Sequence, residues 1–285
     1  MKREVTAYLD RIGWSGELRQ DLPTLAALVR AHRYAVPYET LDLWFRREFS
    51  LAIPAIYDKL VTRRRGGYCF ELNGLFAWLL RELGFNVREY FGRWLLGEDE
   101  EVPMRRHRVI CVALPGHPNQ LVDVGIGLPF MFSPLDFAFA VPQNRDGRVY
   151  RVVRDPVQAS IVEFQAPDGW KRLFSFDTTP QLEHDFDYAH WWCRTNPASS
   201  FLSRVWVYLP RPDGSAKALA FDDKDEFKGW RQLVYCSREA NGENLKIPIG
   251  GPEHLCSILL EHFGIREDLQ DILNPGNRVN IAVTS

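Results

Sequence analysis

The first residue in this sequence whose setting suggests chemistry is Cys69, within RRRGGYCFELNGLF at residues 63–76. A free cysteine has a pKa of about 8.5, so little of it is the nucleophilic thiolate at neutral pH. Cys69 opens an expected helix, whose unpaired N–H groups and positive dipole end stabilise a thiolate. Gly66 and Gly67 permit the chain to approach that point closely. The alternative is a cysteine that only fills the core, as most cysteines among apolar neighbours do.

A nucleophilic cysteine also needs a base, usually a histidine that a third group orients. Of the seven histidines, His107 fits best, because it begins the strand-like segment HRVICVALP. The next segment, QLVDVGIG, contains Asp123, a carboxylate among apolar residues that needs a partner if it is buried. An imidazole N–H is one such partner, and nearby backbone N–H groups are the alternative. His32, His254 and His262 lie in helical patterns, and His117 lies in a turn.

The loop between these two segments decides whether the base and the carboxylate meet. A three-residue loop centred on Gly116 pairs His107 with Gly125 and places Asp123 diagonally on the same face. A loop centred one residue earlier places His107 opposite Asp123. A six-residue loop, 115–120, turns Asp123 to the other face. The sequence alone leaves all three registers open.

The elements that must position these residues follow from hydrophobic spacing. Residues 1–95 are patterned as helices: LPTLAALVRAHRYAVP carries an apolar stripe that Pro37 ends, and the segment after Cys69 runs to a glycine cap at Gly84. From about 87 to 210, short β-branched or aromatic segments predict an antiparallel sheet or barrel. The last third mixes strands with one final helix. The strand segments are NVREYFGRW, HRVICVALP, QLVDVGIG, GRVYRVVR, SIVEFQA, KRLFSFD, SRVWVYLP, ALAF and RQLVYC, and the helix is PEHLCSILLEHFG.

The composition places the chain among soluble globular proteins. With 285 residues, 46% hydrophobic and 25% charged, two or three subdomains are expected. A net charge of -2 argues against a nucleic-acid partner. No signal peptide or membrane span is apparent, and five cysteines without CxxC spacing predict free thiols in a cytoplasmic protein. His190 and Cys193 lack a second pair for a zinc site, so no metal is expected.

With Cys, His and Asp in this order, the sequence resembles the arylamine N-acetyltransferase family. The resemblance covers almost the whole chain, and it implies an α+β enzyme with a papain-like catalytic triad. Three domains are implied: a helical bundle at 1–90, a β-barrel at 91–200 and an α/β lid at 201–285. The motifs that carry the resemblance are RGGYCFE at 65–71, YLDRIG from Tyr8, PYETLD from Pro37, VDVGIG around Asp123, NPASSF at 196–201 and LLEHFGI at 259–265.

The resemblance also implies a reaction, one of xenobiotic metabolism. An acetyl group passes from the cosubstrate acetyl-CoA to an arylamine or arylhydrazine, by a ping-pong mechanism through an acetyl-cysteine thioester. Cys69 would be the nucleophile, His107 would stabilise the thiolate and move protons, and Asp123 would orient His107. Arg65 and Glu71 would form an ion pair that anchors the turn before the nucleophile.

Some positions depart from the family's pattern, which leaves the preferred amine open. Tyr38 stands where the family usually has Phe, and Ile126 stands where it usually has an aromatic residue; with Phe130 they would line the acceptor pocket. Gly127 and Phe201 would contact CoA. The arginines at 105–106 either meet CoA phosphates or form a solvated edge. Arg63 and Arg64 are expected to form a solvated edge.

Other functions share the same three residues. An amide synthase of the same family would use an acyl donor other than CoA. A transglutaminase- or peptidase-like cysteine hydrolase would pair the triad with lysine or water as acceptor. A non-catalytic binding protein is disfavoured, because all three triad residues are present. The sequence does not predict the oligomeric state.

Overall fold

The computed structural model describes residues 1–98, 102–127, 131–222, 229–268, 270 and 272. The chain divides into two compact units, which are described separately. Unit 1 comprises Met1–His32 and Cys69–His190, and unit 2 comprises Arg33–Tyr68 and Trp191–Ser285. Both contain helices and antiparallel strands, so the predicted α+β class is confirmed. The three-domain division at residues 90 and 200 stays a prediction.

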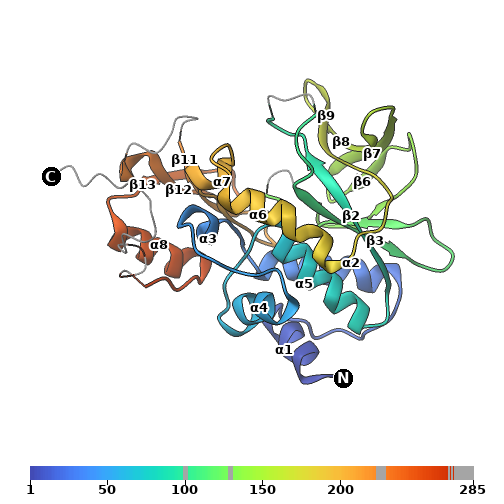
Figure 1. Cartoon of the computed structure of the whole chain (residues 1–285), viewed down its shortest axis with the longest axis horizontal. Helices are drawn as coiled ribbons and strands as arrows, with labels where there is room; N and C mark the ends of the chain where they lie inside the picture. Colours follow the sequence, from blue (N-terminus) through green and yellow to red (C-terminus); the bar gives the residue numbers. More distant parts are fainter. Residues whose placement is uncertain (99–101, 128–130, 223–228, 269, 271, 273–285) are drawn as a thin grey trace. The chain divides into compact units, whose positions relative to one another are not determined.

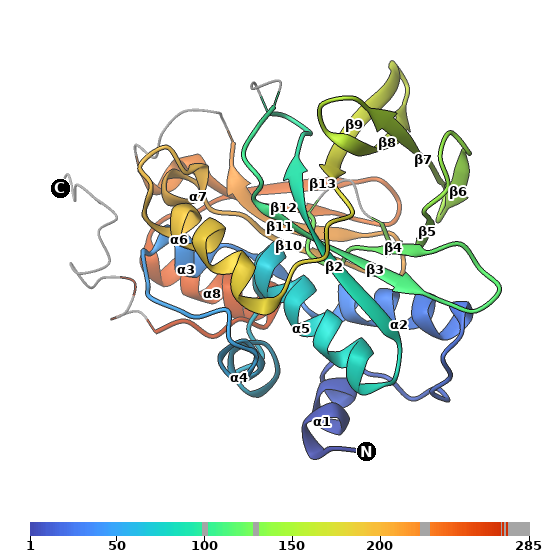
Figure 2. The same cartoon turned by 45° about the vertical axis from the view of Figure 1, so that its right-hand side comes forward.

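Three helices begin the description of unit 1. They are α1 (Arg3–Arg11), α2 (Leu22–Ala35), whose last residues belong to unit 2, and α5 (Cys69–Glu82). As predicted, α2 ends before Pro37, and a left-handed glycine, Gly84, follows α5 with a φ of 87°. Most of α5 is buried, because the helix lies along β2 and β3 (Figures 1 and 2). The nucleophile candidate therefore begins a helix that is fixed by packing.

The sheet of unit 1 contains eight strands, each antiparallel to its neighbours. All six strand segments expected between 87 and 210 are present, although β4 stops at Val122. Sequence reasoning missed the two short end strands, β5 and β6, which have too few residues for an alternating pattern. In spatial order the strands are β5 (Leu135–Asp136), β4 (Gln120–Val122), β3 (His107–Ala113), β2 (Asn86–Trp94), β9 (Gly169–Phe176), β8 (Ala159–Ala166), β7 (Arg148–Asp155) and β6 (Gln143–Arg145).

One glutamine side chain joins the two ends of this sheet. The Gln143 side chain accepts a hydrogen bond from the Asp136 backbone N–H and donates one to the Asp136 carbonyl, both at 2.8 Å. The amide thus replaces the ladder bonds between β6 and β5 and curls the sheet into a nearly closed barrel. An apolar cluster fills the interior: Tyr90, Val109, Leu121, Tyr150, Val162, Leu173 and Phe174 are among its members. The predicted barrel is confirmed.

Unit 2 is built on a five-stranded antiparallel sheet, which covers all the strands predicted for the last third of the chain. Its order is β1 (Tyr38–Glu39), β10 (Val207–Pro210), β11 (Ala216–Phe221), β12 (Leu233–Arg238) and β13 (Asn244–Pro248). Its helices are α3 (Leu41–Trp44), α4 (Ile53–Tyr57) with a π-helical turn (Asp58–Thr62), α7 (Ser200–Ser203) and the predicted α8 (Pro252–Phe263). The boundary between the units falls inside α6 (Asp187–Thr195). Short 3-10 turns cover Glu183–Phe186 and Trp230–Gln232.

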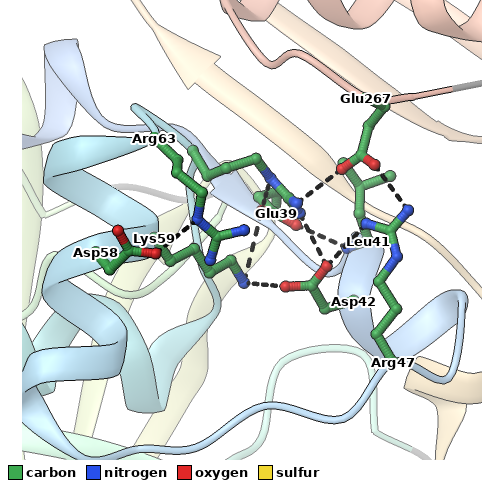
Figure 3. Close-up of polar contacts among 9 residues, drawn as sticks. Glu39, Leu41, Asp42, Arg47, Asp58, Lys59, Arg63 and Glu267 are labelled. Carbon is green, nitrogen blue, oxygen red and sulfur yellow. Dashed lines mark hydrogen bonds and ion pairs between the residues drawn. The ribbon is translucent and has the colours of Figure 1, made fainter. Parts of the chain in front are cut away.

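A buried cluster of ionised side chains surrounds Arg65 in unit 2. Its guanidinium donates to Glu39 at 2.7 Å and to Asp42 at 3.1 Å, and it forms an ion pair with Glu267 at 2.8 Å. Lys59 pairs with Asp42 and Arg47 pairs with Glu267, each at 2.7 Å (Figure 3). Burial disfavours the charge on both Asp42 and Arg65, but their oppositely charged neighbours prevail. They hold the pKa of Asp42 well below its usual range and raise that of Arg65.

This cluster corrects one sequence prediction. Arg65 was expected to pair with Glu71, whereas its carboxylate partners in the structure are Glu39, Asp42 and Glu267. The last of these lies about 200 residues away in sequence, beyond the reach of motif spacing. The neighbouring Arg63 and Arg64 are exposed, as predicted, and Arg63 pairs with Asp58 at 2.9 Å.

The segment 65–67 is also fixed through its backbone. Gly67 forms a parallel bridge with Tyr38, and the Glu39 N–H donates to the Gly67 carbonyl at 2.9 Å. Between these contacts, a Cβ atom on Gly66 would lie only 2.1 Å from the Pro37 carbonyl oxygen. The RGG motif therefore clamps the chain onto residues 37–39, two residues before Cys69. Only glycine fits at its centre.

Two further predictions concern the thiols and the membrane. All five cysteines are free, as their spacing predicted. Within the described ranges, no helix combines the length and the apolar character needed to traverse a lipid bilayer.

The clamp predicts that Gly66→Ala destabilises the protein. The added methyl group would overlap the Pro37 carbonyl, so the segment 65–67 must move away from residues 37–39. We expect this to lower the free energy of unfolding by about 1–3 kcal/mol or more. Urea unfolding measures this. Gly250→Ala is the control, because its Cβ would meet nothing closer than 3.6 Å. Equal stabilities of the two variants would contradict the prediction.

Candidate active site

Cys69 is the first residue of α5, as predicted, so its sulfur lies at the positive end of the helix dipole. It is 4% exposed, and its thiol is a weak donor to the carbonyl oxygen of Arg106, 3.6 Å from Sγ. Cys69 also interacts with His107 and contributes to raising the pKa of that imidazole. A cysteine at a helix start beside a histidine is in a setting that favours its thiolate.

His107 begins β3 and Asp123 directly follows β4, and the two side chains meet. The Nε2 atom of His107 lies 2.6 Å from Oδ2 of Asp123. His107 is 2% and Asp123 1% exposed, so water does not weaken this contact. Because Nε2 faces Asp123, Nδ1 is the ring nitrogen left for the thiol of Cys69. The three predicted catalytic residues are thus brought together in one unit, in the order Cys–His–Asp.

The strand register is the one that a loop centred on Gly116 predicts. Ile110 pairs with Val122 and Val112 with Gln120, which sets His107 level with residue 125. The connection between the strands is longer than the expected three residues, because β3 ends at residue 113 and β4 begins at 120. Asp123 lies beyond the end of its strand, where its carboxylate is free to turn toward His107.

Asn73 is a site residue that sequence reasoning missed. It lies four residues after Cys69, on the same face of α5. Its Nδ2 donates to Oδ1 of Asp123 at 2.9 Å, and its Oδ1 accepts the Val124 N–H at 2.9 Å. The signal in the sequence was a polar residue between Leu72 and Leu75, one turn after the nucleophile.

A backbone N–H completes the hydrogen bonds of the Asp123 carboxylate. The Gly125 N–H donates to Oδ1 at 2.9 Å, beside the Asn73 amide, while Oδ2 faces His107. The two partners that the sequence offered as alternatives, imidazole and backbone N–H, are therefore both present. Such bonds stabilise the ionised carboxylate, which in turn stabilises a protonated His107.

The charges at the site favour the imidazolium form of His107. Burial alone would lower its pKa, but the charge of Asp123, the hydrogen bond with it and the contact with Cys69 outweigh burial and raise the pKa to about 10. A protonated imidazole beside a sulfur at a helix start is the arrangement of a thiolate–imidazolium ion pair. The site can therefore present a sulfur nucleophile at neutral pH.

The residues expected to contact substrates are placed individually. In unit 1, Ile126 is buried in the apolar cluster of the barrel, and Gly127 is half-buried. In unit 2, Tyr38 is half-buried and Phe201 packs edge-to-face on Tyr68 and Trp206. Phe130 lies outside the described residues. Their roles stay predictions.

The arginines before His107 are engaged with acidic side chains. Arg105 pairs with Asp177 at 2.8 Å and is 45% exposed, whereas Arg106 pairs with Glu98. Among the residues that the structure describes, no group of three or more His, Cys, Asp or Glu side chains is arranged to hold a metal ion.

Comparison with known proteins identifies the chain in two steps. Residues 21–270 match a family model described as N-acetyltransferase, which defines the class. Among curated relatives, the arylamine N-acetyltransferase of Mycolicibacterium smegmatis is 37% identical over 75% of this chain and 78% of its own. That of Mycobacterium bovis is 35% identical over 93% of this chain and 90% of its own.

Similarity to solved structures points to the same family. The arylamine N-acetyltransferase of Salmonella typhimurium superposes with a TM-score of 0.85 at 27% identity, over 96% of this chain and 97% of its own. The Mycobacterium marinum enzyme in complex with CoA gives 0.81 at 30% identity, over 96% and 99%. The chain belongs to the arylamine N-acetyltransferase family, as its motifs predicted.

The site predicts that His107 titrates far above an ordinary histidine. Its pKa of about 10 in the folded chain exceeds the usual 6.5. The contribution of protonated His107 to the free energy of unfolding is therefore fully present below pH 6.5 and is lost as pH rises through about 10. Ring nitrogen NMR of histidine-labelled protein follows the titration, and the His107→Gln spectrum assigns the signal. A midpoint near 6.5 would exclude the ion pair.

Proposed function

We propose that this protein transfers the acetyl group of acetyl-CoA to the nitrogen of an arylamine or arylhydrazine, through an acetyl thioester on Cys69. The observation that carries the proposal is the buried Cys69–His107–Asp123 arrangement at the start of α5, in a chain of the arylamine N-acetyltransferase family. A thioester intermediate preserves the activation of the donor and separates the two substrates in time.

In the first half-reaction, the Cys69 thiolate attacks the acetyl carbonyl carbon of acetyl-CoA. The bond from that carbon to the CoA sulfur then breaks, and the proton on His107 passes to the departing CoA thiolate. The acetyl group remains on Cys69 and the imidazole is left neutral. The hydrogen bond that Nε2 of His107 donates to Asp123 keeps the ring in the orientation that presents Nδ1 to the sulfur.

In the second half-reaction, the amine nitrogen attacks the thioester carbonyl carbon. Neutral His107 accepts the proton that the amine loses, and the bond from carbon to the Cys69 sulfur breaks. The products are the N-acetylated amine and the original thiolate–imidazolium pair. His107 is thus an acid in one half-reaction and a base in the other, while Asp123 stays ionised throughout.

Substrate contacts follow the family pattern. Tyr38, Ile126 and Phe130 are proposed to line the acceptor pocket, and Gly127 and Phe201 to contact CoA. A relative from Mycobacterium marinum has been solved in complex with CoA, which supports CoA over the carrier-bound donor of an amide synthase. Water or lysine as acceptor, the hydrolase alternative, has no comparable support. A cytoplasmic location is part of the same proposal.

The donor is tested by mixing the protein with acetyl-CoA alone. Intact-mass analysis should show a gain of about 42 Da, one acetyl group on the nucleophile, together with release of CoA. Cys69→Ala should show neither. A protein that gains no mass and releases no CoA is not an acetyl-CoA-dependent transferase, and the amide synthase then becomes the leading alternative.

The triad is tested with Asp123→Asn. The amide keeps the shape of the carboxylate but removes the charge that holds His107 protonated, so kcat/KM should fall by about 10³–10⁴-fold while the protein stays folded. Steady-state acetylation of an arylamine panel measures the rate, and circular dichroism checks the fold. A rate near that of the wild type would remove Asp123 from the mechanism.

A further inference from the structure

Arg108 is a buried charged residue that the mechanism does not use. It follows His107 in β3 and is 1% exposed, and the five residues after it in that strand are apolar. Burying a guanidinium in this way is costly unless every contact is made.

The guanidinium of Arg108 reaches three elements of unit 1. Its Nε donates to Oε2 of Glu89 on β2, and its Nη1 donates to the Phe70 carbonyl on α5 at 3.2 Å. The ring of Phe186 lies 4.3 Å from its Cζ. The backbone carbonyl of Arg108 also accepts a bond from Nδ2 of Asn73 at 2.6 Å.

These contacts join the neighbours of all three triad residues. Phe70 follows Cys69, Arg108 follows His107, and Asn73 donates to Asp123. We propose that Arg108 is a positioning residue, which fixes the nucleophile end of α5 against the strand that carries His107. The proposal rests on the function proposed above, because it concerns the same site.

The chemistry of this link requires a guanidinium. The guanidinium donates to Glu89 through Nε and to the Phe70 carbonyl through Nη1. A lysine ammonium has a single nitrogen at the end of its chain and cannot replace both donors in this geometry. Glu89 neutralises the charge and receives a second bond, from Arg81 at 2.8 Å. Because a carboxylate pairs with the guanidinium, we expect Arg108 to act on His107 through geometry.

Helix α5 makes room for this side chain with Gly74. A Cβ atom at that position would lie 2.4 Å from Nη1 of Arg108 and 3.0 Å from its Cζ. A methyl group there would displace the guanidinium from the Phe70 carbonyl without changing any charge. Because glycine is otherwise unfavourable inside a helix, its presence is explained by this close approach.

Displacement of the link should loosen the contact between Cys69 and His107. Active-site groups act only within about 0.5 Å of their productive geometry. The charged groups that act on His107 are Asp123, after β4, and Cys69, on α5. If α5 shifts, the imidazolium no longer stabilises the thiolate, and Cys69 reverts toward an ordinary thiol with a pKa of about 8.5.

The test uses Arg108→Lys and Gly74→Ala in the full chain, with iodoacetamide as the probe. Alkylation of Cys69 is followed by peptide mass spectrometry from about pH 6 to 9.5, because the rate reports the thiolate fraction. In both variants, the rate near pH 6 should fall at least about tenfold, equivalent to one pKa unit. Near pH 9.5 it should stay within about threefold of the wild type.

Arg151→Lys is the matched control. Arg151 also pairs with a glutamate on the neighbouring strand, Glu163 at 2.7 Å, and stacks on a ring, Trp170 at 4.0 Å. It lies on β7, away from the triad residues and α5 in the order of strands. Its pH profile should match that of the wild type.

The outcomes separate this inference from the proposed function. A wild-type pH profile in either folded variant would show that Arg108 only stabilises the fold, and would overturn the inference. If Arg108→Lys does not fold, Gly74→Ala decides alone, because it keeps every charge. Should the wild-type protein itself show no reactive Cys69 near pH 6, the proposed thiolate chemistry fails instead.

Discussion

The site depends on one requirement, that the buried carboxylate of Asp123 must be fully hydrogen-bonded. An isolated charge at 1% exposure would take up a proton or unfold its surroundings. Its oxygens instead meet His107, the amide of Asn73 and the N–H of Gly125. These three partners come from β3, from α5 and from the loop after β4. The hydrogen bonds to this one carboxylate therefore hold the helix, the strand and the loop together. They also fix the position of the Cys69 thiol, because Cys69 begins that helix.

A second buried charge system fixes the chain on the other side of Cys69. The cluster around Arg65 and the backbone bridge at Gly67 hold the segment that ends at Tyr68. Cys69 therefore follows a segment that is fixed in place and begins a helix that is packed on its sheet. Neither Asp123 nor the cluster around Arg65 exchanges a proton in the proposed reaction, but each limits the freedom that Cys69 would otherwise have.

Much of this could be read from the sequence, for local reasons. The apolar periods of α2 and α5, the glycine cap at residue 84 and six strands of the barrel depend on neighbouring residues, and these were predicted. The triad followed from residue types and from the family motifs. The partners of Arg65 did not, because Glu267 is distant in sequence. Asn73 was missed because its role exists only once the helix and the loop have met.

The β5 and β6 strands were missed for a related reason. They are too short to carry a pattern, and the Gln143 amide that joins them replaces backbone pairing with a side chain. Sequence reasoning counts strands and their spacing. It has no signal for an amide that completes a sheet.

The hydrogen bonds described around His107 and Asp123 join groups that lie between residues 69 and 125, on α5, β2, β3 and the loop after β4. These groups occupy one uninterrupted stretch of about a fifth of the chain. The proposed substrate contacts all lie outside that stretch. A substitution at one of them therefore leaves these hydrogen-bonding side chains unchanged.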